Sequence, residues 1–222
     1  MKCMFVIPTK NSGYIENCVR SIRDAGHTDD ICVVDSKSED KSYIDHIKKY
    51  NVIVEDITNV HYIDGAIWHC YEKYKDVDFF YVLHDSMVVN NNLSPITKND
   101  FTAFCYFNFD QNGLHFPESQ YAIQKLHSLG EDVSNMENIV GLFGITFYCK
   151  RYVLDELKKQ NLHKILPNSK IEMCGSERIW GYYLWKIGFD IRISNLRNYW
   201  VKDDKTNYIT KLHPTETNNQ RL

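Results

Sequence analysis

The stretch at residues 78–87, DFFYVLHDSM, decides the class of fold. Its first half is a run of apolar and aromatic residues, which is typical of a strand that is covered on both faces. The run ends at His84 and at the carboxylate of Asp85. Open α/β sheets bind ligands outside the carboxyl ends of their strands. We therefore expect Asp85 to lie beside a ligand rather than in the core.

The residues before this stretch alternate between strand-like and helix-like patterns. Short apolar runs predict strands, and apolar residues at helical spacing predict helices between them. Such alternation is typical of a parallel sheet in a doubly wound α/β layout. The predicted strands are residues 3–7, 31–34, 52–54 and 78–83, and the predicted helices are residues 14–26, 43–47 and 66–74.

The second half of the chain has a weaker pattern. Residues 121–129 and 152–160 have helical spacing, and an apolar run at residues 140–149 is broken by glycines. Glu177 is expected to open a further helix that ends at Gly188. We predict one α/β domain over residues 1–222, with a nucleotide-binding half (1–90), an acceptor-side half (91–214) and a tail (215–222).

Composition limits the classes of partner. The 222 residues include 43% hydrophobic residues, and the net charge of −3 gives no reason to expect nucleic acid. The seven cysteines contain no CxxC pair, which favours buried free thiols in a reducing compartment over a zinc site or disulfides. No run of eighteen apolar residues occurs, so we expect no membrane span and a cytoplasmic protein.

Polar residues follow three of the predicted strands. Because parallel strands end at one edge, their loops should meet in a crevice with two carboxylates. One carboxylate can accept from a nucleobase or ribose, and the other can hold a divalent ion that bridges a diphosphate. Neither a GxGxxG nor a GxxxxGK[ST] pattern is present. The candidates are Thr9 and Asn11 from the first loop, Asp35 from the second, and His84, Asp85 and Ser86 from the third.

The segments FVIPTKN (5–11) and ICVVDS (31–36) resemble the opening of GT-A fold nucleotide-sugar glycosyltransferases of the family 2 type. The resemblance implies a Rossmann-like, mostly parallel central sheet flanked by helices. It also implies that Asp35 holds the nucleobase and that Asp85 falls where the family keeps its metal-binding Asp-x-Asp motif. The other residues that it places at the nucleotide are Pro8, Thr9, Asn11, Asp64, Ser86 and Arg178.

The resemblance continues in the second half. GLFG (141–144) is similar to the family's acceptor-side segment, and GSERIWG (175–181) is similar to the acidic segment that carries the catalytic base of inverting members. The base would then be Glu177. KLHP (211–214) resembles the segment of a late histidine, so His213 would complete metal and diphosphate binding.

One departure concerns the metal. A full Asp-x-Asp is absent, so the resemblance leaves Asp85 with His84 and His213 as ligands for Mn²⁺ or Mg²⁺. Imidazole in the coordination shell favours Mn²⁺.

The expected function is metal-assisted transfer of a sugar from a nucleotide-diphosphate donor, with UDP as the nucleotide, to a hydroxyl of a glycan or protein-glycan acceptor. A sugar nucleotidyltransferase and a catalytically inactive nucleotide- or sugar-binding module stay open as alternatives. Individual residues also have simpler interpretations. Asp85 and Asp35 suit turns or caps, Asp64 suits a turn, Glu177 suits the first turn of a helix, and His213 suits a solvated tail.

Overall fold

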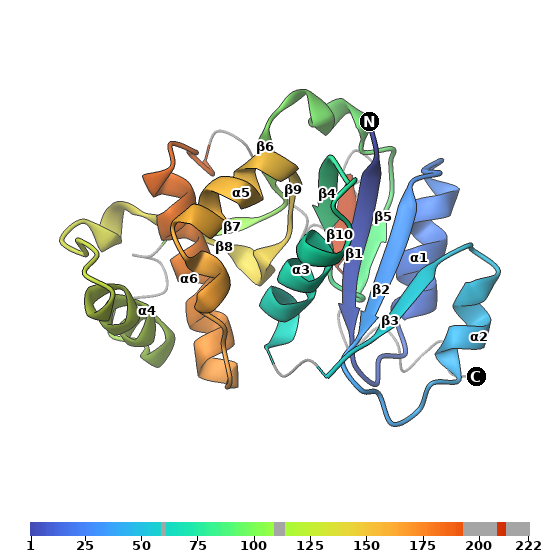
Figure 1. Ribbon diagram of the computed structural model, residues 1–222, viewed down its shortest axis with the longest axis horizontal. Coiled ribbons are helices and arrows are strands. Elements are labelled where there is room, and N and C mark those ends of the chain that lie inside the picture. Colours follow the sequence, from blue (N-terminus) through green and yellow to red (C-terminus); the bar gives the residue numbers. More distant parts are fainter. Residues whose placement is uncertain (59–60, 109–113, 193–207, 212–222) are drawn as a thin grey trace.

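The computed structural model describes residues 1–58, 61–108, 114–192 and 208–211. Its centre is a six-stranded sheet with the order β3-β2-β1-β4-β9-β6 (Figure 1). The strands are β1 (Cys3–Thr9), β2 (Asp30–Asp35), β3 (Ile53–Asp56), β4 (Phe79–Val82), β6 (Phe101–Ala103) and β9 (Phe147–Lys150).

The sheet is mostly parallel, as the sequence predicted. β3, β2, β1 and β4 run parallel, whereas β9 is antiparallel to both β4 and β6. More than forty residues separate β6 from β9 in the sequence, and β9 runs in the opposite direction to its two neighbours in the sheet. The nucleotide-binding half and the acceptor-side half that the sequence suggested therefore share one sheet, joined where β4 pairs with β9.

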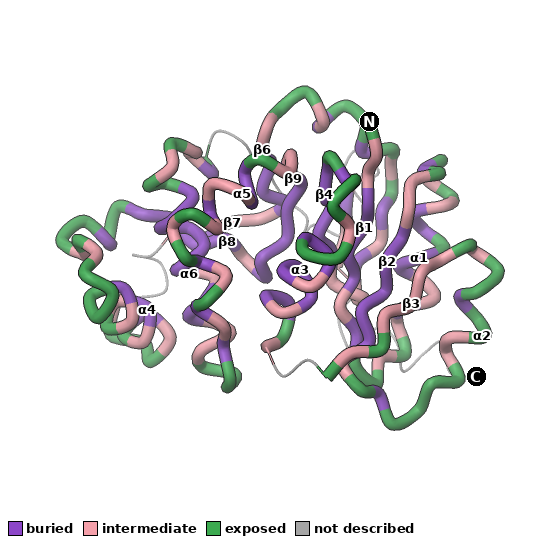
Figure 2. The backbone as a smooth tube through the Cα atoms, in the orientation of Figure 1, coloured by how far each residue is buried: buried purple, intermediate pink, exposed green. Residues whose placement is uncertain are grey.

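Helices cover both faces of the sheet (Figure 1). Alternate residues of a strand point to opposite faces, so the central strands contribute to two cores. The tubes of β1, β2 and β4 are coloured as buried along most of their length (Figure 2). Met4 and Val6 pack in the core that includes α3, α5 and α6, while Phe5 and Ile7 pack in the core that includes α1. The helices are α1 (Ile15–Asp24), α2 (Tyr43–Lys48), α3 (Tyr62–Lys73), α4 (Pro117–Ser128), α5 (Arg151–Lys159) and α6 (Lys170–Lys186).

Two small strand pairs complete the frame of the site. β5 (Met87–Val89) pairs antiparallel with β10 (Ile209–Lys211), which brings residue 211 next to the end of β4. β7 (Tyr106–Asn108) pairs with β8 (Val140–Leu142), and a short 3₁₀ turn at Phe143–Ile145 leads from β8 into β9. That turn lies at the same edge of the sheet as residue 211.

Two arginines close the opposite, amino-terminal side of the sheet. Arg151 donates to backbone carbonyls in α3 and in the loop before β4, including Val77 O at 2.5 Å and Tyr71 O at 3.2 Å. Arg23 likewise donates to the carbonyls of His27, Asp29, Tyr50 and Asn51. Each guanidinium thus satisfies several carbonyls that no strand or helix uses.

In the part of the chain that the structure describes, no helix has the length and apolar character needed to cross a membrane.

Candidate active site

The ends of β1 and β2 bring the first two candidate loops together. Thr9 pairs with Asp35 in the parallel register, and the backbone N–H of Ser36 donates to Thr9 O at 3.0 Å. Thr9 and Asp35 are both buried, with 4% and 0% of their surface exposed. Pro8, the residue before Thr9, is paired with Val34 inside the sheet. The sequence therefore predicted the right edge for these residues.

Asp85 joins this edge from the third loop. The hydroxyl of Thr9 donates to Asp85 Oδ2 at 2.9 Å, across 76 residues of sequence. Burial raises the pKa of Asp85, and hydrogen bonds from Ser12 and Thr9 oppose that rise. A backbone hydrogen bond at Ser86 acts on Asp85 in the same direction. Asp85 is thus held by the first loop, which a simple strand-end turn would not require.

Asp35 keeps one oxygen without a protein partner. Its Oδ1 accepts from the backbone N–H of Ser38 at 2.8 Å, as in a cap. Its Oδ2 is buried and finds no partner among the described residues, and the same holds for the hydroxyl of Tyr43 on α2. Burial raises the pKa of Tyr43, and a hydrogen-bond interaction with Asp35 raises it further, so the Tyr43 hydroxyl and the Asp35 carboxylate lie close together without a well-formed hydrogen bond. Buried polar atoms without partners are costly, so this pair is suited to receive polar groups of a ligand.

Asn11 connects the first and second loops. Its N–H donates to Ser38 Oγ and its side-chain Oδ1 accepts from Glu39 N–H, each at 2.8 Å. Its φ of 50° is left-handed, which asparagine adopts more readily than most residues. A groove of about 450 Å³ lies beside these loops. Its lining includes Asn11, Ser12, Glu39, Asp40 and Tyr43.

The 3₁₀ turn between β8 and β9 links His84 to Glu177. Gly144 donates its N–H to Glu177 Oε1 at 2.9 Å, and its carbonyl faces His84 Nε2 at 2.8 Å. Because a carbonyl only accepts, His84 carries its proton on Nε2. Burial raises the pKa of Glu177 to about 7 and lowers that of His84 to about 4. A carboxyl group that ionises near neutrality is suited to general base catalysis.

Helix α6 begins earlier than the sequence suggested. Glu177 was expected to open a helix, but α6 begins at Lys170, and Ser169 caps it by accepting from Glu172 N–H at 3.2 Å. The Gly175-Ser176 pair before Glu177 lies inside this helix, so the predicted start was wrong. Glu177 is therefore in the middle of α6, where the charge of a helix terminus has little effect.

Asp64 and Arg178 face other parts of the protein. The resemblance placed Asp64 at the nucleotide, with a turn as the simpler interpretation. It lies in the first turn of α3, where its Oδ1 accepts from Ser176 Oγ and Trp180 Nε1, both at 2.7 Å. Burial raises its pKa to about 6. Arg178 donates to Ser119 Oγ at 2.9 Å on α4. The hydrogen bonds of these two residues tie α6 to α3 and α4, and the structure does not bring them to Thr9 and Asp85.

Lys211 is a site residue that sequence reasoning missed. It pairs with Met87 across β10 and β5, and its Nζ lies 5.6 Å from the ring centre of Phe143. Burial lowers its pKa, whereas the charges of Glu177 and Asp85 raise it. In the sequence, Lys211 stands out only as the first residue of the KLHP segment, from which His213 was predicted as a ligand. His213 itself lies outside the described residues.

The described residues contain only part of the predicted metal-ligand set, because His213 lies outside them. They contain no group of three His, Cys, Asp or Glu side chains that could hold one. His84 Nε2 is engaged with a carbonyl, so only its other ring nitrogen is available as a ligand. Asp85 is then the one carboxylate of the expected motif. Mn²⁺ and Mg²⁺ prefer several oxygen ligands, which this set does not supply.

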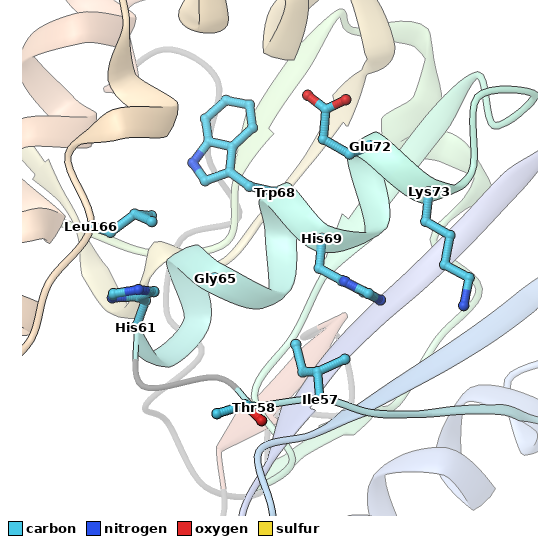
Figure 3. Close-up of a pocket in the computed structure, with 9 residues that line it drawn as sticks. All are labelled: Ile57, Thr58, His61, Gly65, Trp68, His69, Glu72, Lys73 and Leu166. Atoms are coloured by element: carbon cyan, nitrogen blue, oxygen red, sulfur yellow. The ribbon is translucent and has the colours of Figure 1, made fainter.

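A second groove, of about 530 Å³, runs along the outer side of α3 (Figure 3). Trp68 and Glu72 point to one side of the helix, and His69 and Lys73 point to the other. His69 Nε2 lies 3.3 Å from Glu55 Oε2 on β3. None of the site residues predicted from the sequence lines this groove.

No family model matches the chain, and no curated protein sequence is significantly similar to it. Solved structures do resemble it. S. aureus TarS 1-349 aligns with 82% of this chain and 56% of its own length, at 13% identity and a TM-score of 0.47.

Glucosyl-3-phosphoglycerate synthase from Mycobacterium tuberculosis, solved with Mn²⁺, UDP and glucosyl-3-phosphoglycerate, also resembles the chain. It aligns with 85% of this chain and 81% of its own length, at 13% identity and a TM-score of 0.44. This chain spans about half of the TarS fragment and a third of the longer TarS structure. Likeness at this level concerns the fold alone, so activity must be argued from the site.

Proposed function

We propose that the protein is a GT-A-type glycosyltransferase that moves a sugar from a nucleotide-diphosphate donor to an acceptor hydroxyl. The observation that carries the proposal is the arrangement around Gly144. A single turn holds Glu177 next to the strand end that carries His84 and Asp85. A base with a pKa of about 7 beside a set of polar loops is suited to deprotonate a hydroxyl.

The donor's nucleoside would bind at the ends of β1 and β2. Asp35 Oδ2 can accept from an N–H of the base, and the Tyr43 hydroxyl beside it offers a further polar group. Uracil has one such N–H between two carbonyl oxygens, which favours UDP as the nucleotide. Thr9, Asn11 and the Asp85–Ser86 turn would then surround the ribose and phosphates.

Glu177 would act on the acceptor. One of its oxygens accepts from Gly144 N–H, so its second oxygen, Oε2, can take the proton of the acceptor hydroxyl as the new bond to the sugar carbon forms. The bond from that carbon to the diphosphate breaks, and the nucleoside diphosphate leaves. A base on the face opposite the leaving group gives inversion at the sugar carbon.

The first test combines binding with turnover. UDP binding would be measured by isothermal titration calorimetry, and hydrolysis or transfer would be measured across a panel of nucleotide sugars. Glu177→Gln should bind UDP as the wild type does and lose about 10²–10⁴-fold in transfer, the usual contribution of a general base. Glu172→Gln, five residues earlier on the same helix, is the matched control and should keep its activity.

Two other functions remain as alternatives to this proposal. A nucleotide-binding module without turnover is favoured by the single carboxylate at Asp85, and it would bind UDP but hydrolyse no donor in the panel. A sugar nucleotidyltransferase would instead convert a nucleoside triphosphate and a sugar phosphate. Its first loop normally grips a triphosphate, and here that loop has one lysine, Lys10, and one glycine, Gly13.

A further inference from the structure

Lys211 lies beside the end of β4 and the turn at Phe143–Ile145. The register of β5 and β10 sets it opposite Met87, two residues after Asp85. Its Nζ lies over the ring of Phe143, the neighbour of the residue that bonds both His84 and Glu177. The strand register and the ring contact therefore place Lys211 near the strand end that carries Asp85 and near the turn that bonds Glu177.

The charges around Lys211 form a mixed cluster. It interacts electrostatically with Glu177 and Asp85, and also with Lys170, the first residue of α6. Lys170 lies seven residues before Glu177, about two turns, so both project from one face of the helix. The edge thus contains two cations, while the described residues supply too few ligands for a metal ion.

We propose that Lys211, with Lys170 beside it, neutralises the diphosphate of the donor in place of a divalent metal ion. The inference rests on the proposed function and specifies how its leaving group is stabilised. An ammonium group is a compact charge that binds phosphate well. It stabilises charge that develops on the leaving oxygen, and this effect is larger at a partly buried edge than in water.

The same cluster disfavours a dication. A metal ion held by Asp85 would lie within electrostatic range of Lys211, and two positive charges at such a distance repel one another. Asp85 has a different use in this arrangement. Asp85, which accepts from Thr9, and Glu177 both attract the charge of the Lys211 ammonium.

The test compares nucleoside diphosphate with nucleoside monophosphate. UDP and UMP binding would be measured by calorimetry on the full chain, in EDTA and again with Mn²⁺. We expect UDP to bind in EDTA and its affinity to change less than about twofold on adding Mn²⁺. Lys211→Met should weaken UDP by at least about tenfold and UMP much less, because the lost contact is to the second phosphate.

Two controls separate this role from a structural one. Lys211→Arg keeps the charge and should retain most of the UDP affinity. Lys75→Met removes an exposed lysine that pairs with Glu72 and should change nothing. The inference is overturned if UDP binding disappears in EDTA and returns with Mn²⁺, or if Lys211→Met binds UDP as the wild type does.

Failure of the proposed function itself has a different signature. It fails if UDP, GDP, ADP and CDP all leave the calorimeter signal unchanged with and without Mn²⁺, and no nucleotide sugar is hydrolysed. In that case the present inference falls with it. Metal-dependent UDP binding with donor turnover would instead preserve the glycosyltransferase and reject only the role of Lys211.

Discussion

The two buried carboxylates Asp64 and Glu177 have different hydrogen-bond partners. Asp64 accepts from two side chains of α6, so it links two helices and has the partners of a structural residue. Glu177 accepts through Oε1 from the backbone N–H of Gly144, whereas Asp64 Oδ2 makes no hydrogen bond among the described residues. Burial raises the pKa of both, to about 6 and about 7 respectively. Both side chains are buried, so the difference lies in their partners: Asp64 bonds two side chains of α6, as a structural residue does, and Glu177 bonds one backbone N–H.

The raised pKa of Glu177 predicts a pH profile. Transfer needs the carboxylate, so kcat/KM should rise about tenfold per pH unit below pH 7 and level off above it. Glu177→Gln should leave only a slow residual rate without this step. The measurement is a pH–rate profile from pH 5 to 9, and a wild-type profile that is flat through pH 7 would exclude Glu177 as the base.

The same proton affects stability. The Glu177 carboxyl binds its proton more tightly in the folded protein than in the unfolded chain. Its contribution to the free energy of unfolding is therefore complete below about pH 4.5 and is lost as the pH rises to about 7. The upper bound on this loss is about 3 kcal/mol. Urea denaturation of wild type and Glu177→Gln should therefore diverge in favour of the variant as the pH rises.

The hydrogen bonds of Asp64 predict how two substitutions at this position change stability. Asp64→Ala leaves the donors of Ser176 and Trp180 buried without an acceptor, at a cost of about 2–5 kcal/mol. Asp64→Asn keeps an oxygen at the Oδ1 position and should cost less. Urea denaturation at pH 7 measures both, and equal losses would show that the two hydrogen bonds contribute little.

The positions of some residues at the edge follow from the sequence, whereas their roles stay predictions. Thr9, Asp35 and Asp85 were found because they directly follow apolar strands, and strand ends in a parallel sheet share one edge. Tyr43 and Lys211 were missed because their part in the site depends on the packing of a short helix and of a distant strand. Nothing local in the sequence marks either residue as part of a site.

Among the elements, the turn at Phe143–Ile145 has the largest effect on the site. Gly144 has a φ of 63°, and a Cβ there would lie 2.6 Å from His84 Nε2. The turn thus needs glycine both for its backbone and for the approach of the imidazole. Helix α6 contains Gly175 and Ser176, two residues that disfavour a helix interior. Packing against α3 and α4 overrides this local preference, so the helix begins earlier than predicted.

Gly144→Ala should therefore separate binding from catalysis. The added methyl group must displace His84 or the turn, which moves the partner of Glu177, so transfer should fall by about 10²-fold while UDP binding changes only a few-fold. Gly130→Ala is the control, because its φ is 80° but nothing lies within 4 Å of the added Cβ. If both variants lose the same activity, backbone strain alone explains the loss.

The whole molecule is organised by one sheet that both halves of the chain build. β4 pairs with β9 over Phe79–Val82, and Phe147 and Cys149 of β9 share the core with Phe80 and Val82. The parallel part was predictable because its strands alternate with helices in sequence. The antiparallel strands β6 and β9 were not, because their pairing spans long stretches of chain and follows no local period.

This shared sheet predicts that the halves do not fold apart. Residues 1–90 alone would expose the paired edge of β4 and the aromatic side chains that β9 covers, so the fragment should lack a cooperative thermal transition by circular dichroism. Co-expression with residues 91–222 should restore a soluble complex. A cooperative transition in the isolated fragment would mean that the nucleotide-binding half is a domain of its own.

The guanidinium groups of Arg23 and Arg151 hold the backbone more firmly at one side of the sheet than at the other. Each one ties several main-chain carbonyls at the side of the sheet away from the site. At the other side, each residue joins the loops by one or two hydrogen bonds, such as Thr9 to Asp85 and Asn11 to Ser38 and Glu39. Loosening on heating or in denaturant should therefore start at the chemically active rim, so activity should disappear before the fold does.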